Sequence, residues 1–208
     1  MVTNRMDFAL SKLLQQLLRI SNFAHNALAH YIWSSQAFSF GKNTAIHHSC
    51  RISGIGCLSI GSNVSIGING SLYCDAGGEC PKIIIEDGAC LNHGATIFAK
   101  KKITIRKNIV FAPNVYIADH SHEYRNIQMP IKYQGSTDVS EVEIGENCWI
   151  GINACILPGC KIGRNCVIGA NSVVTRSFPS YCVIAGAPAQ LIKKYNEQKK
   201  CWESAKSE

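Results

Sequence analysis

Residues 144–175 read IGENCW, IGINAC, ILPGCK, IGRNCV, IGANSV and VT, a run of units six residues long. Each of the five full units begins with an aliphatic residue, and so does the incomplete sixth unit, VT. These first residues are Ile144, Ile150, Ile156, Ile162, Ile168 and Val174. A helix repeats its apolar face about every 3.6 residues and an alternating strand every second residue, so neither produces this spacing. One short unit cannot bury its apolar side alone and has to stack on its neighbours. The stretch therefore predicts a solenoid.

The fourth and fifth positions of the unit predict its shape. The fourth is Asn or Gly and the fifth is small: Asn147, Asn153, Gly159, Asn165 and Asn171, then Cys148, Ala154, Cys160, Cys166 and Ser172. Asn and Gly accept a left-handed backbone most readily, so the fourth position is expected to form a corner. The aliphatic and the small side chains would then point into a narrow prism. These features predict an all-β chain folded as a parallel β-helix.

The rest of the chain divides around this repeat. Imperfect repeats begin near Gly41, so we expect the β-helix to span residues 41–186, preceded by a helical segment at residues 1–40. Residues 187–208 leave the repeat and read as a polar C-terminal helix that forms a solvated cap. At 208 residues, the chain is expected to be one domain with short appendages.

The N-terminal segment predicts an amphipathic helix. Its apolar residues recur at helical spacing with polar ones between them: Phe8, Leu10, Leu13, Leu14, Leu17, Leu18 and Ile20. A second apolar stretch, residues 23–40, contains several polar residues and is too polar to span a membrane. We interpret residues 7–40 as a cap or a subunit contact, with a peripheral membrane contact as the alternative.

Charge and cysteine content narrow the function classes. The net charge is +7, but Lys and Arg are not interleaved with aromatic residues, which argues against a nucleic-acid partner. Of the eleven cysteines, Cys148, Cys160 and Cys166 fall on the small inward position, where a free thiol behaves as a small hydrophobe. There is no CxxC pair and no secretory signal, so we expect a reduced, cytoplasmic chain without a metal site.

The six-residue period breaks once for a long interval, where residues 119–143 are predicted to form a loop. A long aperiodic loop on a regular scaffold is a common place for binding and catalysis. His120 falls on a corner position, so a backbone role alone would explain it. His122 fills no corner and is the stronger candidate for a general base. Asp119 or Glu123 could orient its imidazole.

Several motifs together carry a family resemblance. They are APNV at 112–115, ADHSHEY at 118–124, IGENCWIG at 144–151, ILPG at 156–159, IGANSVVTR at 168–176 and AGAPAQLI at 185–192. The chain resembles the hexapeptide-repeat O-acetyltransferases, including the maltose and galactoside enzymes, and most closely the branch encoded in capsule, O-antigen and exopolysaccharide clusters. The resemblance implies a left-handed β-helix, a homotrimer with active sites between subunits, acetyl-CoA as donor, and a sugar hydroxyl of a bacterial surface polysaccharide or its precursor as acceptor. It also allows a position at the inner face of the membrane.

The resemblance assigns roles on the acceptor side. The family's catalytic His falls seven positions after the Val of APNV, which is His122 here, and His120 is the second candidate. A substrate-side Asn corresponds to Asn92. Trp149 matches an aromatic residue that lines the acceptor and donor cleft, although simple packing under the loop would also explain it. The His loop is longer than in the small-sugar enzymes, which argues against a free mono- or disaccharide as acceptor.

On the donor side, Ala170, Thr175 and Arg176 match positions that contact CoA through a backbone amide, a hydroxyl and a basic side chain. Gln190 replaces a basic residue that usually meets a CoA phosphate, so Lys193 or the neighbouring lysine would substitute for it. The tetrahedral oxyanion of acyl transfer needs hydrogen-bond donors, and we expect backbone N–H groups near Gly151 to supply them.

Two alternatives remain open. A serine or antibiotic acetyltransferase would use the same fold and donor. A metal hydrolase similar to the γ-carbonic anhydrases would use His93, His120 and His122 as zinc ligands. In that family two ligands stand five residues apart, whereas the last two histidines here are two residues apart.

Overall fold

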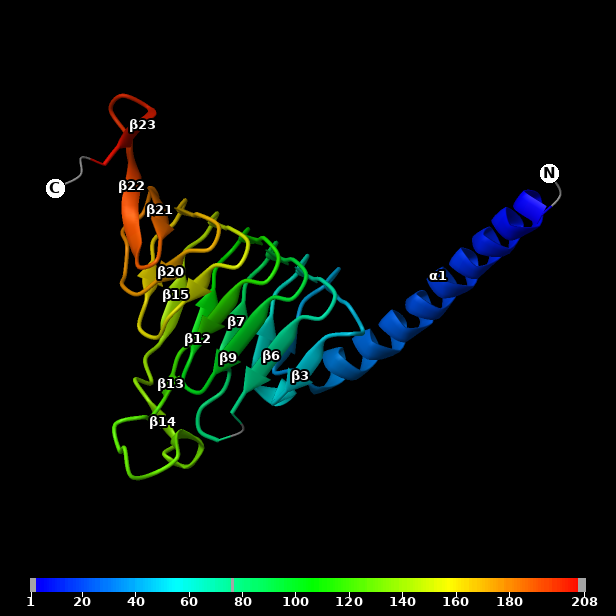
Figure 1. Ribbon diagram of the computed structural model, residues 1–208, viewed down its shortest axis with the longest axis horizontal. Helices are drawn as coiled ribbons and strands as arrows, with labels where there is room; N and C mark the ends of the chain where they lie inside the picture. The colour runs from blue at the N-terminus through cyan, green and yellow to red at the C-terminus, as the bar shows by residue number, and fades with distance from the viewer. Residues whose placement is uncertain (1–2, 76, 206–208) are drawn as a thin grey trace.

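The computed structural model describes residues 3–75 and 77–205 and consists of a long helix followed by a three-sided parallel β-helix (Figure 1). Helix α1 spans Thr3–Gln36. Face A of the β-helix contains β1 Ser39–Phe40, β4 Leu58–Ile60, β7 Ile83–Ile85, β10 Ile103–Ile105, β15 Val142–Ile144 and β18 Lys161–Ile162. Face C contains β3 Arg51–Ser53, β6 Ser71–Cys74, β9 Thr96–Ala99, β12 Tyr116–Ala118, β17 Cys155–Ile156 and β20 Val173–Val174.

Face B is the longest of the three. It contains β2 Ala45–Ile46, β5 Ser65–Ile66, β8 Cys90–Leu91, β11 Val110–Phe111, β16 Trp149–Ile150, β19 Val167–Ile168, β21 Cys182–Gly186, β22 Ala189–Asn196 and β23 Cys201–Ser204. The chain passes from face A to B to C in each coil, so each strand pairs in parallel with the strand one coil above and below, as β10 does with β7 and β15. The C–A edge and the B–C edge are named below for the faces that they join.

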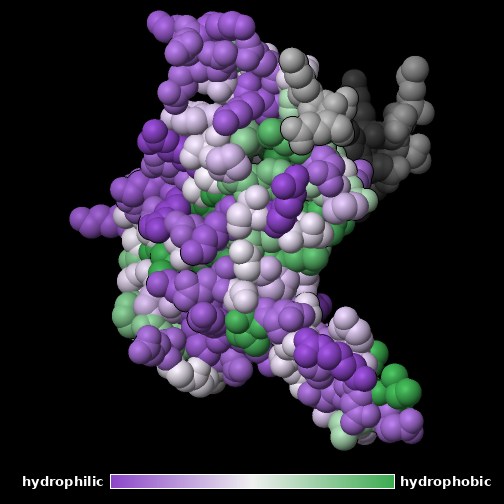
Figure 2. All heavy atoms as spheres, turned by 90° about the vertical axis from the view of Figure 1, so that its left-hand side faces the viewer, coloured by the Kyte–Doolittle hydropathy of each residue, from purple (hydrophilic) through white to green (hydrophobic). Residues whose placement is uncertain are grey.

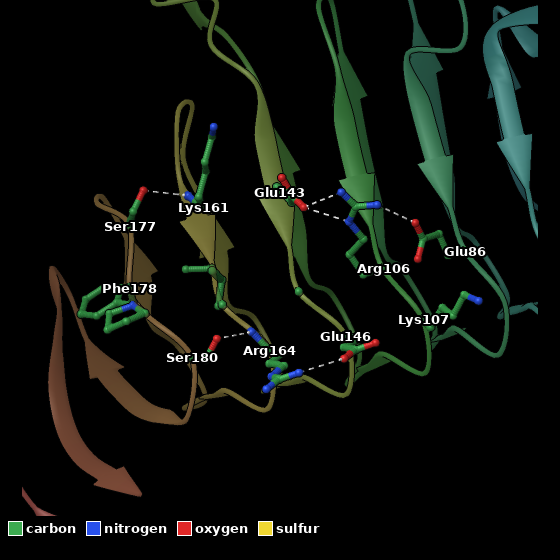
Figure 3. Close-up of a pocket in the computed structure, with 14 residues that line it drawn as sticks. Glu86, Arg106, Lys107, Glu143, Glu146, Lys161, Arg164, Ser177, Phe178 and Ser180 are labelled. Atoms are coloured by element: carbon green, nitrogen blue, oxygen red, sulfur yellow. Dashed lines mark hydrogen bonds and ion pairs between the residues drawn. The ribbon is translucent and has the colours of Figure 1, made fainter.

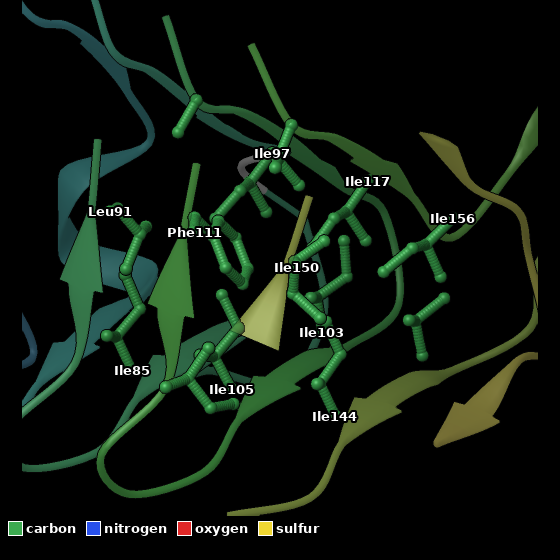
Figure 4. Close-up of a cluster of buried hydrophobic side chains, with 14 of the residues drawn as sticks. Ile85, Leu91, Ile97, Ile103, Ile105, Phe111, Ile117, Ile144, Ile150 and Ile156 are labelled. Carbon is green, nitrogen blue, oxygen red and sulfur yellow. The ribbon is translucent and has the colours of Figure 1, made fainter. Parts of the chain in front are cut away.

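The interior confirms the predicted repeat. Apolar residues from all three faces fill the prism, among them Ile105, Phe111 and Ile117, which are fully buried (Figure 4). The small fifth-position side chains are buried as well, as Cys148 and Cys166 illustrate. Asn residues at the fourth position have φ of about +55°, and these corner side chains form ladders from coil to coil. The repeat therefore specifies both the turn and the core.

Helix α1 is a single continuous helix that projects away from the N-terminal end of the β-helix (Figure 1). Asn26 anchors its C-terminal half, because its Oδ1 accepts the His48 backbone N–H at 2.8 Å, and Trp33 packs against the core. The predicted stripe residues Phe8, Leu10 and Leu13 lie outside the side chains that the structure describes. Among the described helices, none has a stretch long and apolar enough to cross a membrane.

The prediction of a fully reduced chain is wrong for one pair of cysteines. Cys57 ends a short 3-10 helix, Ile55–Cys57, and forms a disulfide with Cys80 in the insertion that precedes β7. Twenty-three residues separate the two cysteines, so their spacing in the sequence gives no signal of the contact. The other nine cysteines are free.

The prediction of a C-terminal helix is also wrong. Strands β22 and β23 form an antiparallel hairpin that continues face B from β21. Strand β21 ends the stack of coils and would otherwise leave one edge unpaired, and β22 satisfies that edge. The rings of Tyr195 and Trp202 pack at 5.4 Å and fix the hairpin, a contact between residues seven positions apart that a helical reading does not anticipate.

Candidate active site

Asp119 is the buried centre of the C–A edge where the long loop leaves the β-helix. Its side chain is completely buried. The carboxylate accepts backbone N–H groups from Lys100, Lys101 and Lys102 at 2.7–3.1 Å. A carboxylate without such donors would be costly to bury, so these amides fix its position.

The fourth partner of Asp119 is His120. The His120 Nδ1 lies 2.9 Å from Asp119 Oδ1, and 19% of the imidazole side chain is exposed. A proton on Nδ1 donated to the carboxylate leaves Nε2 unprotonated and able to accept a proton. The expectation that a left-handed corner explains His120 is wrong, because its φ is not positive, unlike that of Asn114 or Asn153 in neighbouring corners. The carboxylate contact gives this histidine a different explanation.

His122 lies two residues further along and is exposed. It belongs to β13, Ser121–His122, which pairs with β14, Ser136–Thr137, in an antiparallel hairpin at the base of the loop. Its ring has no hydrogen-bond partner within the described residues. Glu123 does not orient either histidine, because its Oε1 accepts the backbone N–H groups of Tyr124 and Arg125 at 2.9 Å. Those bonds lower the pKa of Glu123.

The loop ends in an apolar tip that the rest of the chain does not cover. A short 3-10 helix, Ile131–Tyr133, lies in it, and Gln134 ties the segment together through Asn126 and Met129. Figure 2 shows this projection at the bottom right, with hydrophobic side chains among hydrophilic ones. Ile127 is 89% exposed there.

Several of the predicted site residues fall on two different edges. His120, Thr175 and Arg176 follow strands of face C and lie at the C–A edge. Asn92 and Ala170 follow strands of face B and lie at the B–C edge. Face C separates the two groups, so one copy of the chain does not bring Asn92 to the histidines.

Trp149 lies on neither edge. It points outward from β16 on face B, 55% exposed, between Val110 and Val167 on the adjacent strands. The loop leaves from the C–A edge, so the alternative that Trp149 packs under the loop is wrong. Its exposed ring is available to a ligand or to another subunit.

Gly151 has a structural role at the B–C edge. A Cβ at this position would lie 2.6 Å from the Ala170 backbone nitrogen, so the corners of successive coils stack in direct contact. The Gly151 N–H donates to the Ile168 carbonyl at 2.8 Å and is not free to bind an oxyanion. The Ala170 N–H donates no hydrogen bond within the described residues. The Ala170 N–H is therefore available for the role predicted for it, which stays a prediction, and Gly151 has no side chain to cover it.

At the C–A edge, the C-terminal hairpin reaches one of the predicted donor-side residues. Arg176 donates to Gln190 Oε1 on β22 at 3.1 Å, and its guanidinium lies 4.8 Å from the Phe178 ring. Thr175 is exposed next to it. Lys193 lies further along β22, paired in register with Val183. The hairpin thus brings Gln190 to Arg176, whereas Lys193 lies on face B, away from the C–A edge.

A cavity of about 1010 Å³ contains none of these residues. It lies over face A and carries a ladder of alternating charge in which Arg106 joins Glu86 and Glu143 at 2.7–2.8 Å (Figure 3). Hydrogen bonds to these carboxylates raise the pKa of Arg106. Because these charged side chains pair with one another, they are not free to bind a ligand, which indicates a structural role for this surface.

Comparisons with known proteins identify the family. Residues 141–176 match the family described as bacterial transferase hexapeptide (six repeats). The putative lipopolysaccharide biosynthesis O-acetyl transferase WbbJ of Escherichia coli (strain K12) is 36% identical over 166 residues, which cover 77% of this chain and 83% of that protein. The chain belongs to the hexapeptide-repeat transferase family. Within this family, the chain is an acyltransferase.

Two solved structures agree with this family. A maltose O-acetyltransferase from Clostridium difficile 630 is 30% identical, with a TM-score of 0.53 over 81% of this chain and 75% of that one. A galactoside acetyltransferase in complex with coenzyme A is 27% identical, with a TM-score of 0.52 over 82% and 72% of the two chains. The hexapeptide-repeat transferase described here therefore shares its β-helix with sugar O-acetyltransferases. In its described residues, no group of three His, Cys, Asp or Glu side chains is placed to hold a metal ion.

Proposed function

We propose that this acyltransferase moves an acetyl group from acetyl-CoA to a sugar hydroxyl of a bacterial surface polysaccharide or its precursor. The observation that carries the proposal is the contact between buried Asp119 and half-buried His120 at the root of the long loop. The name of the lipopolysaccharide relative supports the acceptor class, and the coenzyme A complex of the galactoside enzyme supports the donor.

The reaction follows from the two side chains. The Nε2 of His120 removes the proton of the sugar hydroxyl as its oxygen attacks the thioester carbonyl, which contributes roughly 10²–10⁴-fold. Asp119 keeps the Nδ1 proton in place and stabilises the imidazolium that forms. When the tetrahedral intermediate collapses, the C–S bond breaks and the imidazolium protonates the CoA thiolate. The products are the acetyl ester and free CoA.

Two observations favour different histidines as the base. The family motif favours His122, because it stands seven positions after the Val of APNV. The buried carboxylate favours His120, because an oriented imidazole in a fixed tautomer is a more effective base than a free one. We assign the base to His120 and retain His122 as the alternative that mutagenesis can separate.

We also propose that the active form is a homotrimer with the site between copies. Asn92 and the histidines lie on different edges of one chain, so a second copy is needed to bring these groups together. The exposed apolar side chains of the loop, Ile127 and Tyr133 among them, favour burial against a partner of the same sequence. Trp149, Ala170, Thr175 and Arg176 would contact acceptor or CoA in that assembly.

The test is acetyl-CoA turnover followed by the free thiol, with glycans, serine and chloramphenicol as acceptors. We expect thiol release to require a glycan. We expect His120→Ala to lower kcat by roughly 10²–10⁴-fold, and Asp119→Asn to shift the pH profile and lower kcat. His122→Ala is the matched control and should keep most activity. Loss with His122→Ala alone would move the base to His122, and turnover with serine or chloramphenicol would replace the acceptor class.

We propose in addition that helix α1 contacts an anionic lipid surface. Its solenoid-facing side carries Asn26 and Trp33, so the opposite apolar side faces outward. The exposed residues of that side are Leu14, Leu17, Ile20, Leu28, Tyr31 and Ile32. Asp7 is the sole acidic residue among residues 3–36, which also contain Arg5, Lys12 and Arg19. Anionic headgroups complement the net positive charge of this helix, and its apolar side would enter the headgroup region.

Vesicle flotation tests the lipid contact. Wild-type protein should float with phosphatidylglycerol vesicles and much less with neutral phosphatidylcholine vesicles. Replacing Leu14, Leu17 and Leu28 by Gln should lower the affinity at least about tenfold, because each leucine loses apolar burial. The control replaces Gln15 and Gln16 by Ala on another side of the helix. Equal flotation of all variants, or a change of oligomeric size in place of flotation, would contradict the proposal.

A further inference from the structure

A second cavity lies beside the His120 edge and is lined mainly by lysines. Its volume is about 340 Å³, and Lys82, Lys100, Lys101 and Lys102 line it together with Glu79 and Glu141. Three of these lysines donate their backbone N–H groups to Asp119, so the cavity adjoins the residue that orients His120. A group bound here would lie on the same edge of the β-helix as the proposed base.

Lys82 indicates that this is more than a patch of surface lysines. The residue is only 4% exposed, and its ammonium group donates to the Gly77 carbonyl. No carboxylate oxygen of the described residues lies within 4 Å of it. A buried cation is costly unless an anion compensates it, and the adjacent Asp119 carboxylate is already occupied by four donors. The cavity therefore lacks the negative charge that its buried lysine favours.

The remaining charges do not supply that anion. Four lysines line the cavity against two glutamates. The contact between Lys101 and Glu141 is 3.9 Å long and both side chains are about half exposed, so it is a weak surface pair. Glu79 forms no ion pair within the described residues. Lysine ammonium groups are compact point charges that suit phosphate oxygens.

We propose that this cavity binds the phosphate groups of the acceptor, which would then be a sugar carried on a phosphate or diphosphate. The carrier can be a nucleotide or a lipid, because both present the same charged group. The inference rests on the proposed function, since it places the acceptor hydroxyl near His120. It also gives a physical reason for an acceptor larger than a free sugar, because the phosphate supplies binding energy away from the reacting hydroxyl.

Binding of inorganic pyrophosphate tests the cavity without any turnover. Titration calorimetry should detect binding to wild type and a loss of at least about tenfold in affinity for Lys82→Met, as removal of a charged hydrogen bond predicts. The double variant K100Q/K102Q keeps the backbone amides that hold Asp119 and should show the same loss if Lys82→Met fails to fold. The control is Lys161→Gln on face A. Unchanged affinity in the lysine variants would overturn the site.

Steady-state kinetics distinguish the ligand. We expect pyrophosphate to compete with the acceptor and not with acetyl-CoA. The lysine variants should raise KM about 10–100-fold for sugar phosphates, nucleotide-linked sugars or polyprenyl-diphosphate sugars, with kcat nearly unchanged, and should not affect a methyl glycoside. Competition with acetyl-CoA would overturn the proposal by assigning the cavity to the phosphates of CoA. Pyrophosphate binding without turnover on any acceptor would reject the proposed function and leave the anion site intact.

Discussion

At the scale of single residues, side chains of one type have opposite roles according to their neighbours. His120 and His122 are two positions apart, yet only His120 meets a buried carboxylate. Gly151 and Gly56 are likewise the same residue type in different surroundings. A Cβ on Gly151 would meet the backbone of the next coil at 2.6 Å, whereas on Gly56 its nearest contact would be 3.9 Å away. Asp119 stands directly before His120 in the sequence, but its burial depends on the amides of residues 100–102, and the contact at Gly151 comes from the next coil, so local sequence does not reveal these differences.

The glycine contrast gives a stability prediction. Gly151→Ala should lower the free energy of unfolding by about 1–3 kcal/mol, because the added methyl group would force the B–C corners apart. Gly56→Ala is the control and should change it by less than about 0.5 kcal/mol. Urea denaturation monitored by circular dichroism measures both. Equal stability of the two variants would mean that the corner relaxes without cost.

At the scale of elements, helix α1 and the C-terminal hairpin show how the open ends of a solenoid are managed. The hairpin continues face B and pairs the last coil. The helix meets the first coils through histidines instead: the rings of His47 and His48 lie 4.3 Å apart, and those of His25 and His48 lie 5.3 Å apart. Burial lowers the pKa of His47, and the nearby His48 and His93 lower it further.

This histidine cluster predicts a pH dependence for the docking of α1. The pKa of His47 is lowered while α1 is docked. Below the ordinary value of 6.5, the docked state therefore binds a proton on His47 less readily than the undocked state does. Docking should therefore be unaffected above that pH and should weaken as the pH falls below it. Hydrogen exchange of the amides between residues 23 and 36, measured at several pH values, checks this. His47→Gln should flatten the response, and a stronger docking at acid pH would contradict it.

At the scale of the whole molecule, the β-helix isolates its cysteines. Cys50, Cys160 and Cys182 are buried, and burial raises the pKa of each thiol. Burial also raises the pKa of Cys74 to about 11. A raised pKa leaves less thiolate near neutral pH, and the stacked coils exclude reagents as well. Cys201 is exposed on the C-terminal hairpin.

Thiol titration checks this arrangement. At pH 8 the native protein should react rapidly with a disulfide reagent at Cys201 and slowly elsewhere. Unfolding in guanidinium should raise the count to the nine free cysteines, and reduction before unfolding should raise it to eleven. The control is Cys201→Ser, which should abolish the rapid phase of the reaction with the reagent. Eleven thiols without reduction would contradict the bond between Cys57 and Cys80.

The sequence by itself determined the solenoid, its core positions and its Asn corners, because a six-residue period is a local property that each unit repeats. The break in this period also predicted the long loop at residues 119–143. The tertiary structure decided what depends on distant contacts: that the amides of residues 100–102 hold Asp119 buried, that Asn92 lies on another edge, and that residues 189–204 add strands to face B. The six-residue period specifies that coils stack. It does not specify which side chains meet between stacked coils, because those residues stand about twenty positions apart in the sequence.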